Sequence, residues 1–580
     1  MAVVSSFNLL PNRSNSRAQL FEPTALPRLP PVADAHAEHV HQQQRPPRRA
    51  PAFVVNTAAC NGKSAKDLYS LVAEELGWQE VDVRAQQVSK KPTIYCMTQT
   101  ADMLQRMPLL GQRCWVSRYL AFPDLCDKGN FARMIIACKS FCNPGDFSFV
   151  PKTWVVPDHM SALRSEMANS KGTFIVKPED GAQGDGIYLV KSDRDLTSKL
   201  AIRSNACAIV QRYIEKPLLL HGVKFDLRIY VCFIGGSDRA PPHVFLCREG
   251  LARFCTEAYE EPAASNMHKC MSHLTNYSLN KRSDKFEHSG TTAQEVYDLR
   301  STASKRPLTV ALKQMRQEYP GFDIGQFYEN VSELVQKSAA IMAPLLASYH
   351  RGQGQSEMPC FQTLGFDVIL DTKFVPFLLE INNNPSLCID EALPLLPEST
   401  GPDEAVQSSP SRMRERGKTC RCMDMAQPHY HQTAMVDLIV KRTTMLGAFR
   451  LLQQITAGSA ARDPSFLEIS VEDVPAYDFL SRLEGFFHRC GGAAKAFTSG
   501  ALRRNLGLAC GHGRLQKLDL DTLSQKFRGS GRFAVRDAGA KCDALRVFEF
   551  LELLKNAAEL AFPDERMETS LGRLLTVVGA

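Results

Sequence analysis

The chain has 580 residues, of which 44% are hydrophobic and 23% are charged. This balance excludes a collagen-like or largely disordered chain and provides sequence for about three to four domains, or for fewer large ones. The formal net charge of +7 is compatible with an acidic partner without requiring one, and no run of 18 or more apolar residues predicts a membrane span.

The N-terminal residues 1–55 are rich in Pro, Arg, Ser and Gln, and such a composition predicts a disordered tail. The first twenty residues contain Ser and Arg but no acidic residue, so an organellar transit peptide is an open alternative. The 18 cysteines show no framework spacing, which indicates reduced thiols in the cytosol.

Residues 56–157 are predicted to form an α/β domain, with a first amphipathic helix over 65–78. Buried strands are predicted at 173–178, 187–190 and 206–214. The glycine-rich loop 181–186 joins the first two strands. This order differs from the strand-to-helix order of a Walker or Rossmann loop, although glycines still permit backbone N–H groups to approach a phosphate.

A further strand over 224–233 opens with Lys224, Asp226 and Arg228, which alternate with apolar residues. Alternation places the three charges on one face. That face either lines a cleft or lies on a half-exposed edge strand. Two more strands are predicted at 243–247 and 252–255, followed by a polar loop at 273–278, a polar segment at 283–306 and a long helix over 324–349.

The strongest pattern is a hairpin at 361–390, with strands at 364–370 and 373–381 and a turn at 371–373. Each strand carries one carboxylate at an inner position, Asp367 in the first and Glu380 in the second, and Asn382 follows on the same face. A buried carboxylate requires a partner. Two carboxylates and an amide oxygen form a hard-oxygen site suited to Mg²⁺, whereas the alternative is a solvated hairpin edge.

After the hairpin, residues 396–460 are predicted to form a basic linker and a helix. Arg412, Arg414 and Arg416 belong to the linker, and Lys441 and Arg442 to the helix. The basic residues form either a solvated segment or a contact for an acidic partner. Residues 461–580 are predicted to be a helical extension.

Seven motifs occur in a fixed order: IVKP, GAQGDGIYLV, VQRYIEKPLL, KFDLRIYV, GLARFCTEAY, HLTNYSLN and GFDVILD with LLEINNNPSL. Together they resemble the tubulin tyrosine ligase-like family, and within it the chain-elongating tubulin polyglutamylases. The resemblance covers residues 153–390 and implies an α/β fold with an ATP-grasp core, whose central and catalytic domains occupy 158–395. It also implies a nucleotide held between two sheet layers.

The resemblance also assigns roles to residues. Lys177, Arg228 and Gln183 would be catalytic, with the first offsetting phosphate charge, the second stabilising the transferred phosphoryl group and the third facing the acceptor. The implied ATP-binding residues are Lys177, Gln183, Gly184, Gln211, Arg212, Tyr213, Ile214, Lys224, Asp226, Thr275 and Asn276. Two Mg²⁺ ions would be held by Asp367, Glu380 and Asn382, and free L-glutamate by Arg253, Tyr277, Ser278 and Lys305.

The implied activity is ATP-dependent addition of glutamate to tubulin C-terminal tails through an acylphosphate. Gln183 favours α-linked chain elongation, because initiating members tend to have arginine there. The alternatives are an initiating polyglutamylase, a glycylase or an inactive microtubule-binding scaffold. We expect a monomer in the cytoplasm and cytoskeleton, with cilium, flagellum or basal body as further sites, and neither a nucleic-acid nor a membrane partner.

Overall fold

The computed structural model describes most of the chain from residue 52 onward. The described residues are 52–60, 63–82, 91–98, 114–179, 184, 186–201, 207–237, 239–351, 357–394, 429–490, 499–506, 509, 515–516, 519–523, 525 and 546–578. The tail predicted for residues 1–55 lies outside them except for its last four residues. Strand β1 begins at Val54 and is buried there, so the folded part starts slightly earlier than predicted.

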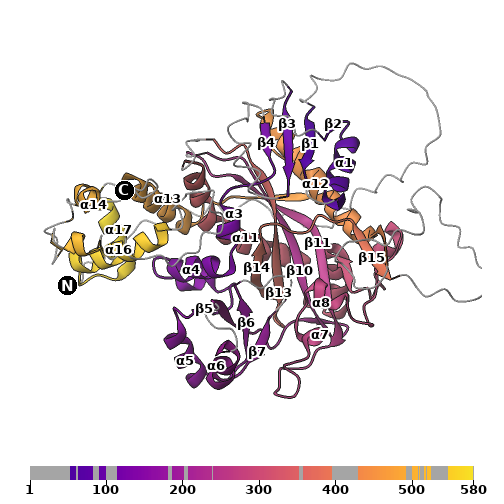
Figure 1. Cartoon of the computed structure of the whole chain (residues 1–580), viewed down its shortest axis with the longest axis horizontal. Helices are drawn as coiled ribbons and strands as arrows, with labels where there is room; N and C mark the ends of the chain where they lie inside the picture. Colours follow the sequence, from indigo (N-terminus) through magenta and orange to yellow (C-terminus); the bar gives the residue numbers. More distant parts are fainter. Residues whose placement is uncertain are drawn as a thin grey trace, which may run out of the picture. The chain divides into compact units, whose positions relative to one another are not determined.

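A parallel four-stranded sheet, in the order β2-β1-β3-β4, forms the first layer (Figure 1). Its elements are β1 (Val54–Ala59), α1 (Lys63–Glu75), β2 (Gln79–Val81), β3 (Thr93–Met97) and β4 (Cys114–Val116). Helix α1 buries Leu68, Tyr69 and Val72, which recur at helical spacing. The helix predicted over 65–78 is therefore present, although it ends three residues earlier.

A smaller antiparallel sheet has the order β5-β8-β6-β7. Its strands are β5 (Thr153–Val156), β6 (Phe174–Pro178), β7 (Tyr188–Val190) and β8 (Ala208–Arg212), and its helices are α5 (Met160–Asn169) and α6 (Asp193–Ala201). Trp154, Phe174 and Val176 pack with Leu163 and Leu196 of the two helices in one core. The three strands predicted in this region are present, each shorter than expected.

The central sheet follows the path β12-β11-β10-β13-β14, with β9 paired to β10 and β17 paired to β11. Its strands are β9 (Leu219–Leu220), β10 (Val223–Ile234), β11 (His243–Ala258), β12 (Lys305–Pro307), β13 (Phe361–Leu370), β14 (Pro376–Asn382) and β17 (Phe466–Ile469). The two strands predicted at 243–247 and 252–255 were wrong as separate elements, because β11 runs through both. The β13–β14 hairpin is antiparallel as predicted; in its turn, Asp371 Oδ1 accepts hydrogen bonds from Lys373 N and Val375 N at 2.9 Å each.

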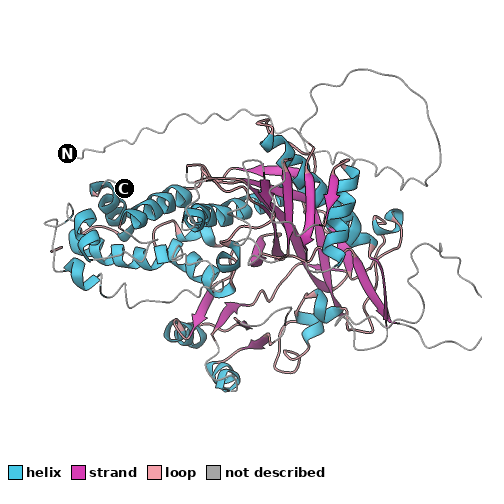
Figure 2. Ribbon diagram, turned by 45° about the horizontal axis from the view of Figure 1, so that its top comes forward, coloured by secondary structure: helices cyan, strands magenta, loops and turns pink. Residues whose placement is uncertain are grey.

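The two faces of the central sheet differ along β10. Phe225, Leu227, Ile229, Val231 and Phe233 belong to the large core that also contains residues of α10 (Leu308–Glu318) and α11 (Ile324–Arg351). On the opposite face, Lys224, Asp226 and Arg228 are followed by Tyr230, Cys232 and Ile234, which pack with residues of α12 (Met435–Thr456). Helices thus lie on both sides of this sheet (Figure 2), and Lys224 and Asp226 are buried within the charged stretch.

Short elements fill the connections. They are α3 (Phe122–Leu125), α4 (Lys128–Cys138), η2 (Pro144–Phe147), α7 (Cys270–His273), α8 (Tyr277–Asn280) and α9 (Ala293–Val296). The polar segment 283–306 therefore has structure that the sequence analysis did not predict, since it contains α9 and the start of β12. Helix α9 begins with a capping box between Thr292 and Glu295, which satisfies its first backbone donors.

The C-terminal part begins with a two-stranded sheet of β15 (Asp390–Pro394) and β16 (His429–Thr433), followed by α12. Its later helices are α13 (Pro475–Arg489), α14 (Ser499–Leu506), α16 (Arg546–Ala561) and α17 (Met567–Val577). They gather beside α4 and α11 (Figure 1). The extension predicted as helical from residue 461 contains β17, so its first elements belong to the central sheet.

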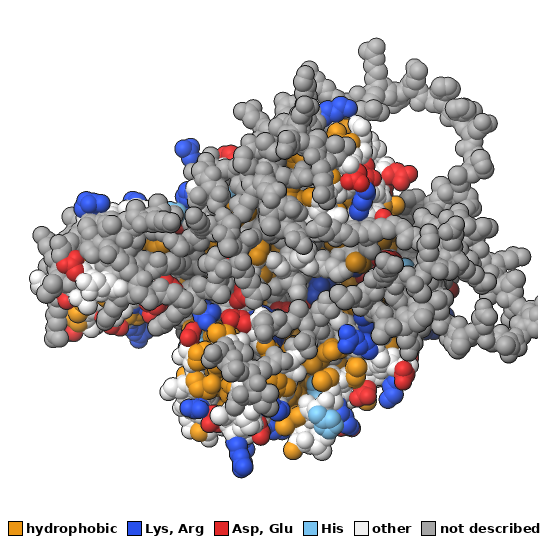
Figure 3. Space-filling model, viewed as in Figure 1, with side chains coloured by type: hydrophobic (Ala, Val, Ile, Leu, Met, Phe, Trp, Pro, Cys, Tyr) orange, Lys and Arg blue, Asp and Glu red, His pale blue; other side chains and the backbone are white. Residues whose placement is uncertain are grey.

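Charged side chains of both signs are interspersed over the described surface shown in Figure 3. The basic run that includes Arg412, Arg414 and Arg416 lies outside the described residues. Lys441 and Arg442 form ion pairs within the chain, with Asp437 and Glu75 respectively. Within the part of the chain described, no helix is both long and apolar enough to cross a membrane, and all cysteines are free thiols.

An ion cluster joins α13 to α11. The carboxylate of Glu484 accepts hydrogen bonds from Arg351 Nη2 and pairs with His488 Nε2 at 2.6 Å. The same His488 nitrogen lies 2.8 Å from Ser348 Oγ. Burial would raise the pKa of Glu484, but its bonds to His488 and the nearby charge of Arg351 hold the pKa below its ordinary value. The ionised carboxylate therefore stabilises the docked helix.

We predict that Glu484→Gln lowers the thermal midpoint at pH 7, with a loss of about 2 kcal/mol of stability from weakened charge-assisted hydrogen bonds. Because the folded pKa is depressed, this contribution is present above the unfolded value of about 4.5 and is lost as pH falls through the folded value. The difference between the two midpoints should therefore shrink below pH 4.5.

The matched control is Glu333→Gln, which breaks an exposed ion pair with Lys337 on the same α11 and should leave the midpoint nearly unchanged. Equal midpoints for Glu484→Gln and wild type at pH 7 would show that the cluster does not hold α13 in place.

Candidate active site

Charged side chains lie in register across five strands of the central sheet, β12, β11, β10, β13 and β14. Asp226 lies opposite Arg253, which in turn lies opposite Lys305. On the other side of β10, Arg228 lies opposite Asp367, and Asp367 lies opposite Glu380. Because Asp226 and Arg228 are two residues apart, both rows lie on one face. The polar face predicted from the alternation in β10 is confirmed.

Two arginines and two aspartates form a buried network at the centre of this face. Arg228 donates to Asp367 at 2.5 and 3.0 Å, and Arg253 donates to Asp226 at 2.6 and 2.7 Å. Arg253 Nη2 also lies 2.9 Å from Asp367 Oδ2. The four charges balance, so burial of each is compensated.

The two aspartates differ in their electrostatics. Burial alone would raise the pKa of Asp367, but the charges and hydrogen bonds of Arg228 and Arg253 hold that pKa below its ordinary value. The pKa of Asp226 is raised instead, since burial and the neighbouring charge of Asp367 outweigh the effect of Arg253. The pKa of Arg253 is raised, because its two carboxylate neighbours outweigh its burial. Asp367 is therefore the firmly ionised member.

Lys177 links the smaller sheet to the central one. Its Nζ donates to Gln211 Oε1 at 3.0 Å and to the carbonyl oxygen of Leu379 in β14 at 3.2 Å. Gln211 is itself held by Thr153, whose Oγ1 accepts from Gln211 Nε2 at 3.0 Å. Burial lowers the pKa of Lys177, which the negative charge of Glu380 partly opposes. The cation thus lies where the two sheets meet.

Lys224 and Thr275 extend the polar face toward α7. Lys224 Nζ donates to Tyr213 OH and to the carbonyl oxygen of His273, both at 2.8 Å, and lies 4.2 Å from the centre of the Tyr213 ring. Burial lowers the pKa of Lys224 to about 8. Thr275 Oγ1 donates to Asp226 at 2.5 Å. The predicted ATP-binding residues on these elements therefore contact one another.

Arg212 is the exception among the predicted ATP-binding residues. Its guanidinium turns to α5, where Nη2 lies 2.7 Å from Ser170 Oγ and 3.3 Å from Glu166 Oε1. Its backbone N–H donates to Lys152 O at 2.8 Å. The Arg212 side chain therefore points away from the charged face, and Ile214 nearby is half-buried.

Gly184 lies close to α8. Its φ of +89° is in the region that favours glycine, and a Cβ there would lie 2.8 Å from Leu279 Cδ1 and 3.1 Å from Asn276 Cγ. The glycine-rich loop therefore approaches Asn276 more closely than any side chain would allow. Gln183 lies outside the described residues.

Lys305 and Tyr277 adjoin one another at the β12 side of the site. Lys305 Nζ lies 3.7 Å from the centre of the Tyr277 ring and donates to Asp437 Oδ2 at 2.6 Å. Ser278, on the same short helix, is half-buried. Asp437 in α12 was missed by the sequence analysis. The sequence does contain a sign of Asp437, which is the spacing of an i,i+4 pair with Lys441. Both residues lie on the buried face of α12.

Arg118 is a second residue that the sequence analysis missed. It is buried and donates to Met97 O and Asn383 O, both at 3.1 Å, and to Thr98 O at 3.2 Å. Its Nη2 also donates to the Asn384 side chain. The guanidinium therefore fixes the segment that directly follows Asn382, from the end of the first sheet.

The predicted metal-binding residues converge. Asn382 Nδ2 lies 3.2 Å from Asp367 Oδ2 and 3.3 Å from Glu380 Oε1. Carboxylate and amide oxygens are the donors that Mg²⁺ prefers, so these residue types fit the ion. In this structure the Asn382 amide nitrogen faces both carboxylates, and Arg228 and Arg253 bind the two oxygens of Asp367. In the described part of the chain, no group of three or more His, Cys, Asp or Glu side chains forms a metal cluster.

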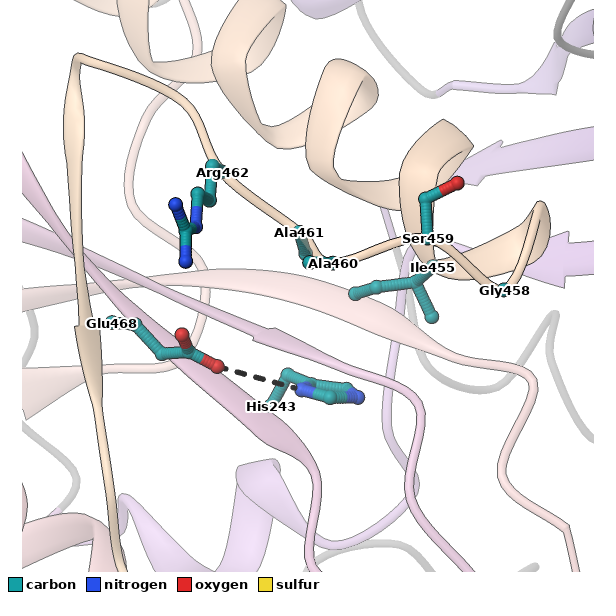
Figure 4. Close-up of a pocket in the computed structure, with 8 residues that line it drawn as sticks. All are labelled: His243, Ile455, Gly458, Ser459, Ala460, Ala461, Arg462 and Glu468. Atoms are coloured by element: carbon teal, nitrogen blue, oxygen red, sulfur yellow. Dashed lines mark ion pairs between the residues drawn. The ribbon is translucent and has the colours of Figure 1, made fainter.

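A separate pocket of about 300 Å³ lies where β11 begins (Figure 4). It is lined by His243, Ile455, Gly458, Ser459, Ala460, Ala461, Arg462 and Glu468. His243 Nδ1 and Glu468 Oε1 form an exposed ion pair at 3.9 Å across it. Since Arg253 lies ten residues further along β11, this pocket is distinct from the charged face.

Comparison with known proteins matches residues 80–395 to the tubulin-tyrosine ligase family. The chain is 39% identical over 266 residues to tubulin polyglutamylase TTLL11 of Mus musculus, covering 44% of this chain and 34% of that protein. It is 37% identical over 289 residues to tubulin polyglutamylase TTLL7 (48% and 29%) and 31% identical over 361 residues to tubulin polyglutamylase TTLL6 (61% and 40%), both of Mus musculus. The chain thus spans about a third of the length of these relatives.

We predict that Asp367→Asn lowers the thermal midpoint strongly, by about 3 kcal/mol of stability, because Arg228 and Arg253 lose a shared buried carboxylate. The control is Asp298→Asn, which removes the same charge from an exposed pair with Arg300 and should leave the midpoint nearly unchanged. If the two variants melt together, the arginine–aspartate network does not stabilise the fold.

Proposed function

The chain belongs to the tubulin-tyrosine ligase family, and we propose that it is an ATP-dependent ligase that adds glutamate to glutamate side chains in tubulin C-terminal tails. The observation that carries this proposal is the charged face of the central sheet. Arg228 donates to Asp367 on this face, and the Asn382 amide lies within 3.3 Å of Asp367 and Glu380. Lys224 lies on the same face of β10, and Lys177 reaches the carbonyl oxygen of Leu379 in β14. Three cations beside a hard-oxygen set suit transfer of a phosphoryl group.

The proposed reaction has two steps. An oxygen of the acceptor carboxylate attacks the γ-phosphorus of ATP, and the bond from that phosphorus to the β–γ bridging oxygen breaks, giving an acylphosphate and ADP. The amino group of free glutamate, as the neutral amine, then attacks the acyl carbon. An amide forms, and phosphate leaves with the oxygen that came from the acceptor.

The chain's own residues bind and orient the reactants in this scheme. Lys177, at the junction of the two sheets, offsets charge on the α- and β-phosphates, and Arg228 stabilises charge on the transferred group. Backbone groups near Tyr213 hold the adenine, while Gly184 lets the loop approach the phosphates closely. Asp367, Glu380 and Asn382 would hold two Mg²⁺ ions, whose chemistry is to neutralise phosphate charge.

The incoming glutamate is assigned to Arg253, Tyr277, Ser278 and Lys305. The charge of Arg253 is balanced by Asp226 and Asp367, whereas Lys305 pairs with Asp437, a carboxylate that also pairs with Lys441. Lys305 is therefore the better candidate to bind the side-chain carboxylate of glutamate.

Several features support this function over its alternatives. The matched relatives are named polyglutamylases, which favours glutamate over glycine as the amino acid. A catalytically inactive scaffold would be expected to lack a phosphate-binding lysine or a metal carboxylate, yet Lys177, Asp367 and Glu380 are all present. We further propose microtubules as partners, a monomeric state, and a cytoplasmic and cytoskeletal location that includes cilia, flagella or basal bodies.

We predict that Glu380→Gln lowers ligation by at least about 100-fold, because a group that offsets transition-state charge is lost. The measurement is incorporation of glutamate, and separately of glycine, into tubulin C-terminal peptides by mass spectrometry with ATP. Glu318→Gln is the matched control; this α10 carboxylate pairs with His221, and the variant should retain full activity. Normal turnover by folded Glu380→Gln would refute the metal assignment, and incorporation of glycine alone would refute a glutamate ligase.

We also predict that Gln183 directs the enzyme to chain elongation. A glutamine can donate to and accept from the acceptor, whereas an arginine only donates and clamps a carboxylate. Rates are compared on two synthetic tail peptides, one unmodified and one with a single branch glutamate. Wild type should prefer the branched peptide, and Gln183→Arg should shift the preference toward the unmodified one. Equal wild-type rates on the two peptides would contradict elongation.

A further inference from the structure

Four hydrogen bonds join Arg118 to the end of β3 and to the segment that follows β14. At β3, Nε donates to Met97 O at 3.1 Å and Nη2 donates to Thr98 O at 3.2 Å. After β14, Nη1 donates to Asn383 O at 3.1 Å, and Nη2 donates to the amide oxygen of Asn384. The Asn384 amide nitrogen in turn donates to Thr98 O at 3.3 Å. The first sheet thus holds the two residues that follow the last strand of the central sheet.

Gln362 on β13 is a second donor to the same carbonyl oxygen. Its Nε2 lies 2.5 Å from Asn383 O, and its Oε1 accepts a hydrogen bond from Tyr119 N, next to Arg118, at 2.8 Å. Arg118 is 6% exposed and Gln362 is 2% exposed. We refer to these two side chains as the Asn383 clamp. Both reach Asn383 from chain segments that are distant in the sequence.

The charge of Arg118 is buried without a carboxylate beside it. Its four acceptors are carbonyl and amide oxygens, and within the described part of the chain it forms no ion pair. Burial lowers the pKa of Arg118, since an isolated buried cation is costly. The guanidinium has a planar fork of donors that a lysine lacks, and here the fork binds two chain segments at once. Its hydrogen bonds therefore serve to fix these segments relative to one another.

The clamp acts on the residue that directly follows Asn382. Asn382 is the last residue of β14 and lies opposite Gly365 in the β13–β14 ladder. The ladder fixes the backbone up to this point, and the clamp fixes it immediately afterwards, at Asn383. Between the two, the Asn382 side chain lies 3.2 Å from Asp367 Oδ2 and 3.3 Å from Glu380 Oε1.

We propose that Arg118 and Gln362 are positioning residues for the metal-binding set, and that they hold the backbone of Asn383 so that the Asn382 side chain stays beside the two carboxylates. This inference rests on the proposed function, since it takes Asn382 as a ligand of Mg²⁺. Neither clamp residue binds the ion in this scheme. Residues that orient metal ligands typically change metal affinity about 10- to 100-fold when they are replaced.

The experiment measures the affinity of the full chain for the non-hydrolysable ATP analogue AMPPNP by titration calorimetry, once with Mg²⁺ and once with EDTA. The ratio of the two dissociation constants is the gain from magnesium. Arg118→Leu should reduce this gain about tenfold and Gln362→Leu at least about threefold, while the affinity in EDTA stays within about twofold of wild type. Loss of a cation alone would act in the opposite direction, because the nucleotide carries more negative charge without Mg²⁺.

Arg306→Leu is the matched control for lost hydrogen bonds of a buried arginine. Arg306 is 2% exposed and donates to Ala303 O and to Gln314 Oε1, both at 2.8 Å. Its loss should lower the thermal midpoint, as Arg118→Leu does, and leave the gain from magnesium within about twofold of wild type. If Arg306→Leu reduces the gain as much as Arg118→Leu, the gain follows stability and the inference is overturned. An unchanged gain in folded Arg118→Leu, or in Gln362→Leu where Arg118→Leu does not fold, would also overturn it.

Asn382→Ala tests the underlying assignment on its own. A reduced gain in Asn382→Ala with an unchanged gain in Arg118→Leu would overturn the role of the clamp alone. An unchanged gain in Asn382→Ala would overturn the assignment of Asn382 to the metal in the proposed function, and the role of the clamp with it.

Discussion

The site depends on one constraint, the alternation of side chains along β10. The odd-numbered residues from Phe225 to Phe233 enter the large core with α10 and α11, so the register of this strand is fixed by apolar burial. The even-numbered residues must then lie on the other face. The side chains of Asp226 and Arg228 therefore lie on the face opposite the core. A shift of β10 by one residue would place both charges in the core.

The neighbouring strands place residues of opposite charge beside Asp226 and Arg228. Arg253 and Asp367 lie opposite Asp226 and Arg228, and the resulting pairs compensate one another in a region where an isolated charge would be costly. Lys177 connects the smaller sheet to the central sheet through its hydrogen bond to the carbonyl oxygen of Leu379. The same ladder that builds the fold therefore brings together the groups to which the proposed function assigns phosphate and carboxylate.

Strand periodicity predicted much of the charged face. It could not predict contacts between residues that are far apart in the sequence. Asp367, Glu380 and Asn382 could be assigned to one face because a hairpin with period two leaves no alternative. Asp437 could not, since its partner Lys305 lies 132 residues away, and Arg118 contacts a chain segment 265 residues away. Lys441 was assigned to a basic segment, because its spacing from Asp437 is also typical of an exposed i,i+4 pair, and the burial of the pair depends on its contact with Lys305. The short strand β17 lay inside a segment with mainly helical periodicity.

The most direct test of the whole account follows one oxygen atom. A branched tail peptide labelled with ¹⁸O in its acceptor carboxylate is incubated with the protein, ATP and glutamate, and the released phosphate is analysed by mass spectrometry. Activation of the carboxylate on the charged face predicts that each phosphate released with an amide carries one ¹⁸O atom. Amide formation with unlabelled phosphate would contradict an acylphosphate and, with it, the proposed role of this face.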